Sequence, residues 1–279
     1  QNFKPHFPFS KIRKQQQDAL NFLHQSFIDE NKKFVILEAG TGVGKSAVGY
    51  CFANFINANT LETAYFLTTQ KILQEQYIKD FGAPKGPMRS IYSSSNYACT
   101  FHTSQTCGES LRAVKTAERG SKFWKNCVLN CRYKNEKENF LNSNVSVTNF
   151  PYFMAESQYA GKIKPRGFLV IDEAHNVANE LSKFIEITIS DRFSKAFIGK
   201  PLPARGTSLQ YLKWITKTYL PGLTHKLKHL EKMLEKYIGL KDKIRSGEFA
   251  SISKKFDSLD KHVCKVRRFL KLYSAENWV

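Results

Sequence analysis

The sequence predicts an α/β fold in which helices cover both faces of a parallel sheet, and three observations lead to it. Short apolar runs alternate with segments of helical periodicity over residues 12–81. A glycine-rich turn at 39–44 follows one apolar run and precedes a helical segment. A second apolar run, at 168–171, ends in two carboxylates. Parallel strands need helical crossovers, which then cover the sheet, so this alternation favours a doubly covered parallel sheet.

The individual elements are predicted from the spacing of apolar side chains. In chain order we expect a helix at 12–27, a strand at 34–37, a helix at 46–56, a strand at 64–67, a helix at 71–81, and strands at 145–148 and 167–172. The alternation breaks at residue 82, and we expect an irregular, cysteine-bearing insertion to follow. After about Leu181, amphipathic stripes from Leu223 to Ile238 and from Leu259 to Leu270 predict a mainly helical region.

Positive charge is concentrated in two segments. The 279 residues hold 43 Lys and Arg against 24 Asp and Glu, a formal net charge of +19. Residues 85–140 hold 10 basic and 4 acidic side chains, and residues 190–279 hold 20 and 8, which leaves the rest nearly neutral. This distribution is typical of a track for a polyanion, and we expect nucleic acid. A merely solvated basic surface, or one that binds anionic lipid, would carry the same charge.

The turn after the second expected element has the pattern of a phosphate-binding P-loop. Its residues are Ala39, Gly40, Thr41, Gly42, Val43, Gly44, Lys45 and Ser46. Glycines let backbone N–H groups point at phosphate oxygens, and the following helix adds the positive end of its dipole. We therefore expect ATP here, with Lys45 reaching the β- and γ-phosphates and the Ser46 hydroxyl ligating Mg²⁺. Many P-loops have glycine where Ala39 stands, and a chance glycine-rich turn would look similar.

The carboxylates after 168–171 would complete this site. A carboxylate at the carboxyl end of a buried strand, beside a P-loop, is placed to hold Mg²⁺, so Asp172 is the second expected magnesium ligand. Glu173 is expected to orient and deprotonate the attacking water. We expect His175 to couple the site to neighbouring motor elements rather than to bind metal. The alternative is an exposed turn that follows a strand.

The sequence Asp172-Glu173-Ala174-His175 after a P-loop resembles superfamily 2 helicases, whose motor consists of two RecA-like domains. Residues 7–16 are similar to the adenine-reading motif of the XPD/DinG branch, with Arg13 and Gln16 in the matching places. Further similar motifs follow in that family's order: motif Ia at 67–76, the start of an iron–sulfur domain at 95–99, and its end at 131–133 and 147–150. The resemblance covers about residues 7–180.

The resemblance implies a RecA-like motor domain that two insertions interrupt. The implied boundaries are 1–84 and 141–180 for the motor domain, 85–140 for an iron–sulfur cluster domain, and 181–279 for a helical Arch-like domain. It also implies contacts to single-stranded DNA, and the matching residues are Thr68, Thr69, Thr148 and Asn149. Residues 276–279 look like the return from the Arch. We therefore expect the second motor domain and its arginine fingers to be missing, and this fragment alone to be inactive.

Four cysteines of the insertion, Cys99, Cys107, Cys127 and Cys131, are separated by 7, 19 and 3 residues. Four thiolates can hold a [4Fe–4S] cluster or a tetrahedral zinc ion, and the spacing alone leaves both open. The resemblance favours the cluster. The side chains around them include Phe101, Phe123, Trp124 and Tyr133, and Arg112, Lys115, Arg119, Lys122 and Lys125. Aromatic groups beside cations would suit stacking on a single strand, or a small core around the cluster.

These features predict an ATP-dependent DNA helicase, a DNA-stimulated ATPase with 5′-to-3′ polarity implied by the resemblance and a role such as DNA repair. The expected cofactors are ATP, Mg²⁺ and a [4Fe–4S] cluster, and the expected partners are single-stranded DNA and forked or tailed duplex DNA. Alternatives are an RNA-remodelling ATPase and, for the isolated fragment, a non-catalytic DNA-binding iron–sulfur module. No apolar run approaches the roughly 20 residues of a membrane span, and no secretory leader is visible. We therefore expect an intracellular protein without membrane association, in the cytoplasm and nucleoid or in the nucleus.

Overall fold

The computed structural model describes residues 2–103, 105–114, 117–157, 161–238 and 247–274. Lys115 and residues 276–279 lie outside the described residues, as do the side chains of Arg112 and Ile238. The chain divides into two compact units. We call residues 1–93 and 133–184 the sheet unit, and residues 94–132 and 185–279 the helical unit. The four-part division expected from the sequence stays a prediction.

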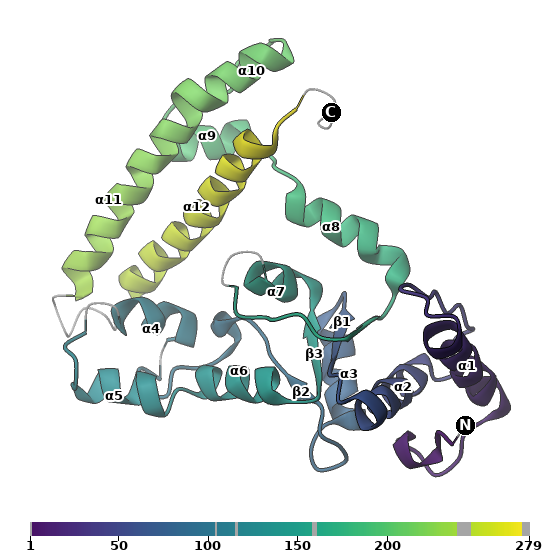
Figure 1. Cartoon of the computed structure of the whole chain (residues 1–279). Helices are drawn as coiled ribbons and strands as arrows, with labels where there is room; N and C mark the ends of the chain where they lie inside the picture. Colours follow the sequence, from purple (N-terminus) through teal and green to yellow (C-terminus); the bar gives the residue numbers. More distant parts are fainter. Residues whose placement is uncertain (1, 104, 115–116, 158–160, 239–246, 275–279) are drawn as a thin grey trace. The chain divides into compact units, whose positions relative to one another are not determined.

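The sheet unit alternates helices and strands, and Figure 1 labels its helices and strands in place. In chain order they are η1 Lys4–His6, α1 Lys14–His24, η2 Gln25–Asp29, α2 Lys45–Thr60, β1 Ala64–Thr68, α3 Lys71–Phe81, β2 Arg89–Ser90, α6 Arg132–Asn142, β3 Val145–Asn149, α7 Phe150–Ala155, β4 Phe168–Ile171, η5 Ala174–Asn176 and α8 Val177–Ile185. The strands form one parallel sheet in the order β2-β3-β1-β4. The predicted α/β class is confirmed.

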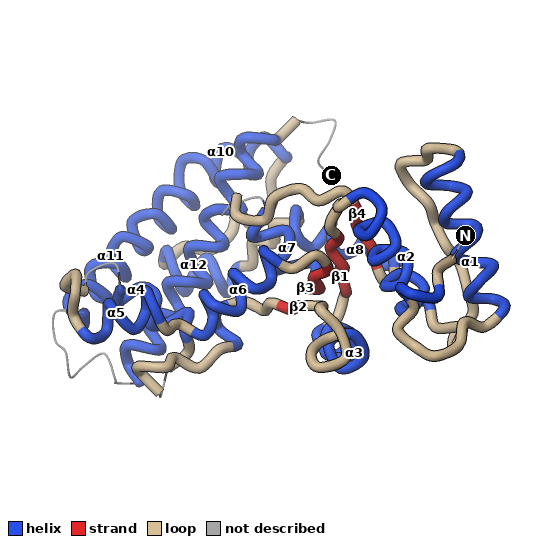
Figure 2. Tube along the Cα trace, turned by 60° about the horizontal axis from the view of Figure 1, so that its bottom comes forward, coloured by secondary structure: helices blue, strands red, loops and turns tan. Residues whose placement is uncertain are grey.

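Helices cover both faces of the sheet. Adjacent residues of a strand point to opposite sides, so each central strand packs against helices on both faces. Every residue of β1 and β3 is buried. On one face, Phe66 packs against Tyr77 of α3 with ring centroids 5.5 Å apart. On the other, Tyr65 packs against Phe140 of α6 and Phe153 of α7, at 5.7 and 5.6 Å. Figure 2 shows the strands among these helices, an arrangement that a parallel sheet requires.

The strand expected at 34–37 does not form, and that prediction was wrong. Phe34 is 91% exposed and Ile36 is 85% exposed, whereas Val35 and Leu37 pack against the core. Alternate side chains therefore face solvent and protein, as they would in a strand. No described strand pairs with the segment, and β4 pairs with β1 alone. Apolar patterning does not by itself supply the hydrogen-bond ladder that defines a strand.

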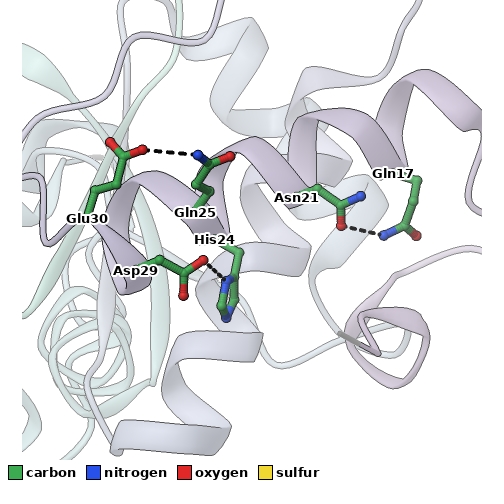
Figure 3. A network of polar contacts seen from close by, with 6 residues as sticks. All are labelled: Gln17, Asn21, His24, Gln25, Asp29 and Glu30. Carbon is green, nitrogen blue, oxygen red and sulfur yellow. Dashed lines mark hydrogen bonds and ion pairs between the residues drawn. The ribbon is translucent and has the colours of Figure 1, made fainter.

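Helix α1 carries the amino-terminal motif and is fastened on two sides. Leu20 and Leu23 are buried in the core of the sheet unit. Polar contacts run along the rest of the helix and across the π-helical turn η2, as Figure 3 shows. They join Gln17 to Asn21 at 3.0 Å, His24 to Asp29 at 3.4 Å, and Gln25 to Glu30 at 3.1 Å. The first pair has the i,i+4 spacing that stabilises a helix face, and the other two are five residues apart, across the π-helical turn that continues α1.

The helical unit consists of η3 Ser94–Asn96, α4 Cys107–Val114, α5 Lys122–Leu129, α9 Asp191–Ile198, α10 Ser208–Trp214, η6 Ile215–Tyr219, α11 Leu220–Ile238 and α12 Gly247–Leu272. Helices α11 and α12 pack along each other, and Leu223, Leu259 and Val263 of the two predicted stripes are fully buried between them. The expectation of an irregular stretch around the cysteines was wrong, because α4 and α5 occupy much of it. None of the described helices is both long enough and apolar enough to span a membrane.

Candidate functional site

The glycine-rich turn leads directly into α2, which begins at Lys45. Gly42 and Gly44 have φ angles of +81° and +87°, in the left-handed region that side chains disfavour. A Cβ atom on Gly44 would also lie 2.7 Å from Gln16 Nε2. Glycine at this position is therefore required by the backbone conformation and by the close approach of a neighbouring side chain.

Two residues of the amino-terminal motif hold the backbone of the turn. Gln16 Nε2 donates to the Val43 carbonyl at 2.8 Å, and Arg13 Nη1 donates to the Gly42 carbonyl at 3.1 Å. The Arg13 amide in turn donates to Gln16 Oε1 at 2.9 Å. A trans peptide points its carbonyl and its N–H in opposite directions, so the N–H groups of Val43 and Gly44 face away from these two side chains. The two side chains therefore fix the turn and leave the Val43 and Gly44 N–H groups on its opposite side. A phosphate-binding loop needs backbone donors on the side where the phosphate binds.

Lys45 and Ser46, the two side chains expected to reach phosphate and magnesium, follow at the start of α2. Lys45 Nζ donates to the Ala39 carbonyl at 2.9 Å, so its ammonium lies across the glycine-rich turn. The Ser46 side chain lies near the hydroxyl of Tyr77 on α3. The helix N-terminus adds positive potential at this position.

Asp172 is hydrogen-bonded to the same tyrosine. It follows β4, and its amide donates to the Leu67 carbonyl of β1 at 3.0 Å. The Tyr77 hydroxyl donates to Asp172 Oδ2 at 3.1 Å, and the Glu173 amide donates to Oδ1 at 3.0 Å. Sequence reasoning missed Tyr77. The available signal was its place on the inward side of the helix at 71–81, three residues after the buried Gln74.

Glu173 adopts a φ angle of +53°, one of three non-glycine residues with positive φ in the described chain. Such a conformation costs about 1 to 3 kcal/mol and persists where the surroundings enforce it, often at functional sites. Its carboxylate Oε2 lies 3.3 Å from His175 Nδ1, and both side chains are substantially exposed. The His175 Nε2 atom also lies 3.0 Å from Asn176 Nδ2. Glu173 is thus accessible to solvent, and its carboxylate lies beside the His175 ring.

The residues expected to touch DNA have mostly internal partners. Thr148 is fully buried and donates to the Ile91 carbonyl at 2.8 Å. Thr68 is also buried and donates to the Gln70 carbonyl at 3.1 Å. Asn149 caps α7 through Tyr152 and donates to the buried Gln74 at 3.2 Å. Contact between DNA and these three side chains would require their hydrogen bonds to break. Thr69, which is half-buried, has the most accessible side chain of the four.

The four cysteines of the insertion gather in the helical unit. Cys99, Cys107, Cys127 and Cys131 are all at most 6% exposed and line one small cavity. The sulfur atoms of Cys107 and Cys131 are 3.4 Å apart. Burial raises the pKa of the Cys107 thiol, and the three neighbouring cysteines raise it further. Over the described residues, no three His, Cys, Asp or Glu side chains converge as they would around one metal ion.

The aromatic side chains beside the cysteines contribute to packing. The rings of Phe101 and Phe123 are 5.3 Å apart, and His102 packs on both of them. Tyr133 is buried in the sheet unit, with its hydroxyl 3.1 Å from that of Tyr152. Phe101, at 38% exposure, is accessible for stacking, whereas Tyr133 is not.

A basic hollow lies on the helical unit. It is lined by Leu220, Pro221, Thr224, His225 and Lys228 of α11 and by Arg267 of α12, and no carboxylate is among these residues. Basic groups without an acidic neighbour attract anions such as phosphate. This surface belongs to the second of the two basic segments that the sequence contains.

Comparison with known proteins gives a family for the chain. The family model described as "Type III restriction enzyme, res subunit" matches residues 9–198, which is more than half of the chain. No curated protein matches the chain. The matched stretch includes the glycine-rich turn, the parallel sheet and the Asp172-Glu173 pair, and this family contains the amino-terminal motor of superfamily 2 helicases. The chain therefore belongs to the type III restriction enzyme res subunit family and carries a helicase-like ATPase motor domain with a RecA-like fold.

Proposed function

We propose that the sheet unit is the first motor domain of an ATP-dependent DNA helicase, which couples ATP hydrolysis to movement along a single strand. The observation that carries the proposal is the meeting of two segments that are distant in sequence. The Tyr77 hydroxyl donates to Asp172 at the end of β4 and lies near the side chain of Ser46 at the start of α2. A P-loop helix and an acidic strand end that meet in this way form the basis of a nucleotide-hydrolysing site.

In this proposal the triphosphate binds along the glycine-rich turn. Lys45 stabilises the charge that develops on the transferring phosphoryl group. Ser46 and Asp172 would hold Mg²⁺, and the donor set fits because hydroxyl and carboxylate oxygens are the hard ligands that this ion prefers. When bound, Mg²⁺ neutralises charge on the β- and γ-phosphate oxygens. Arg13 and Gln16 shape the turn and contribute to reading the adenine.

Glu173 is the proposed general base. An accessible carboxylate next to the metal-ligand position can orient a water molecule and accept its proton. The strained backbone of Glu173 supports a functional role for this residue. His175, which contacts the Glu173 carboxylate, is proposed to relay the state of this site to the other motor elements.

The nucleic-acid partner is proposed to be single-stranded DNA and forked or tailed duplex DNA, with 5′-to-3′ movement. The basic segments at 85–140 and 190–279 support a polyanionic partner. Thr69 is the proposed motif Ia contact with the strand, because Thr68, Thr148 and Asn149 have internal partners.

We further propose that Cys99, Cys107, Cys127 and Cys131 hold a [4Fe–4S] cluster, and their common buried cavity supports a shared ligand. Their chemistry fits, since four thiolates are the ligand set of such clusters. Zinc is the competing occupant. Two thiolates on one tetrahedral zinc ion would lie roughly 3.8 Å apart, from a Zn–S distance of about 2.3 Å, and the sulfur atoms of Cys107 and Cys131 are close to that separation.

The test is strand displacement by the intact protein on matched DNA and RNA substrates, with ATP turnover followed in parallel. The proposal predicts DNA-stimulated hydrolysis and displacement of DNA from a tailed duplex. Glu173→Gln should abolish turnover and retain nucleotide binding, because the amide cannot accept a proton. Displacement of RNA but not of DNA would contradict the assignment and favour an RNA-remodelling ATPase.

A further inference from the structure

Tyr77 of α3 is buried beneath the candidate nucleotide site. Only 3% of the residue is exposed. Its ring packs between Phe66 of β1 and Phe81 of α3, with centroids 5.5 and 5.7 Å away. Rings packed on two sides have few alternative rotamers, so the position of the Tyr77 hydroxyl is fixed by the core rather than by solvent.

The hydroxyl of Tyr77 holds one of the two expected magnesium ligands. It donates to Asp172 Oδ2 at 3.1 Å, and the other oxygen of that carboxylate accepts from the Glu173 amide at 3.0 Å. The Ser46 side chain lies near the same tyrosine hydroxyl. Each carboxylate oxygen of Asp172 therefore has a donor within the protein.

The bond from Tyr77 connects segments that the backbone does not connect locally. Tyr77 belongs to α3, and Asp172 follows β4. An aspartate side chain can rotate about its two side-chain torsions, and only some of its conformations direct Oδ2 toward Tyr77. A donor whose position is fixed by the core removes part of that freedom before any ligand binds. Preorganised groups bind a ligand more tightly because less order is lost on binding.

We propose that Tyr77 is a positioning residue that holds Asp172 in place for the magnesium–nucleotide complex. The inference rests on the proposed function of the sheet unit and adds a residue to it. Tyr77 is not itself proposed as a ligand. It acts by holding the Asp172 carboxylate within reach of the ion, and its contribution should appear as magnesium-dependent nucleotide affinity.

The experiment compares Tyr77→Phe with the unchanged chain. Binding of a fluorescent, non-hydrolysable ATP analogue is titrated once with Mg²⁺ and once with EDTA. Phenylalanine keeps the packed ring and removes only the hydroxyl that donates to Asp172. The unchanged chain should gain affinity from Mg²⁺. In Tyr77→Phe that gain should be about tenfold smaller, the size expected for one hydrogen bond to a charged group. Affinity in EDTA should stay within about twofold.

Tyr50→Phe is the matched control. Tyr50 is also a buried tyrosine that packs on Phe81, at 4.4 Å, and its hydroxyl is not bonded to Ser46 or Asp172. This variant should keep the full magnesium-dependent gain. Thermal unfolding of both variants checks that the sheet unit is intact, because a merely structural tyrosine would lower stability without changing the ratio of the two affinities.

Two results would overturn the inference. An unchanged magnesium-dependent gain in Tyr77→Phe would show that the hydroxyl does not position Asp172. A larger gain would show that the hydroxyl obstructs binding of the ion. Lys45→Ala separates this failure from failure of the proposed function. If the unchanged chain and Lys45→Ala bind the analogue equally, the assignment of the nucleotide site is wrong. The proposed role of Tyr77 is then wrong as well.

Discussion

Replacing Arg166 with methionine should destabilise the sheet unit by about 3 kcal/mol. Arg166 was not singled out by its sequence context, yet its guanidinium ties three parts of the sheet unit together. It donates to the Ala64 carbonyl at 2.7 Å, the Leu141 carbonyl at 3.0 Å, and the Phe140 carbonyl and Ser146 hydroxyl at 3.1 Å each. It also lies 4.0 Å above the ring centroid of Tyr65. These contacts join the start of β1, strand β3 and the end of α6.

The magnitude follows from these contacts. Four hydrogen bonds at about 1 kcal/mol net each give about 4 kcal/mol, and the contact with Tyr65 adds about 1 kcal/mol. Burial lowers the pKa of Arg166, which indicates a cost of removing its charge from water. Methionine avoids that cost, which offsets roughly 2 kcal/mol of the loss. The remainder is about 3 kcal/mol, which corresponds to a change of about a hundredfold in the opening equilibrium.

Hydrogen exchange read by mass spectrometry is the assay, because it reports on β1 and β3 directly. Exchange in these strands should accelerate about a hundredfold in Arg166→Met. Arg166→Lys is the matched variant: it keeps the charge but loses the planar fork, so its effect should be intermediate. An acceleration below about threefold in Arg166→Met would refute the reasoning, since the four bonds would then contribute little to stability.

Three further predictions concern DNA, the cysteines and pH. Affinity for single-stranded DNA should fall about a hundredfold between 50 and 200 mM salt if about five phosphates are neutralised, and a salt-independent affinity would contradict nucleic-acid binding through the basic segments. Cys107→Ser should lose bound iron and the visible absorption and make residues 84–140 protease-sensitive, whereas Cys264→Ser should not; one zinc and no iron in anaerobically purified protein would rule out the cluster. Burial lowers the pKa of His262, whose Nε2 lies 2.8 Å from the Tyr219 hydroxyl, and nearby Lys265 lowers it further. The unfolded chain therefore takes up this proton first, and the free energy of unfolding of the helical unit should fall as the pH drops below about 6.5. Fluorescence of Trp214, which stacks on Tyr219, reports the transition, and a slope that persists in His262→Gln would contradict this origin.

Periodicity predicted most of the helices and strands of the sheet unit. The helix at 71–81 and the strands around 64–67, 145–148 and 167–172 appear where apolar spacing placed them. The strand at 34–37 failed because pairing depends on a neighbour that apolar spacing does not specify. Helices α4 and α5 were missed because the cysteine-bearing stretch was read as irregular from its polar composition and lack of an apolar period. In the structure these helices carry Cys107 and Cys127, whose side chains are buried.

The motifs of the candidate site could be predicted from the sequence, but the hydrogen bonds between its distant segments could not. The glycine-rich turn and the Asp172-Glu173 pair are recognisable because their chemistry requires particular residues at short spacing. Tyr77 and Arg166 act on partners far away in the sequence, and nothing in their neighbourhood indicates those partners. The same holds for Thr148, whose buried hydroxyl bonds to Ile91 across the fold.

The central claim is that the turn before α2 binds the phosphates of ATP through Lys45. The most direct test is the affinity of the unchanged chain and of Lys45→Ala for a fluorescent ATP analogue in the presence of Mg²⁺, with thermal unfolding as a check on folding. Loss of the ammonium should weaken binding at least tenfold, because a charge-assisted contact with phosphate is worth about 1.5 to 3 kcal/mol, and the unfolding temperature should be unchanged. Equal affinities for a folded Lys45→Ala variant and the unchanged chain would contradict the claim.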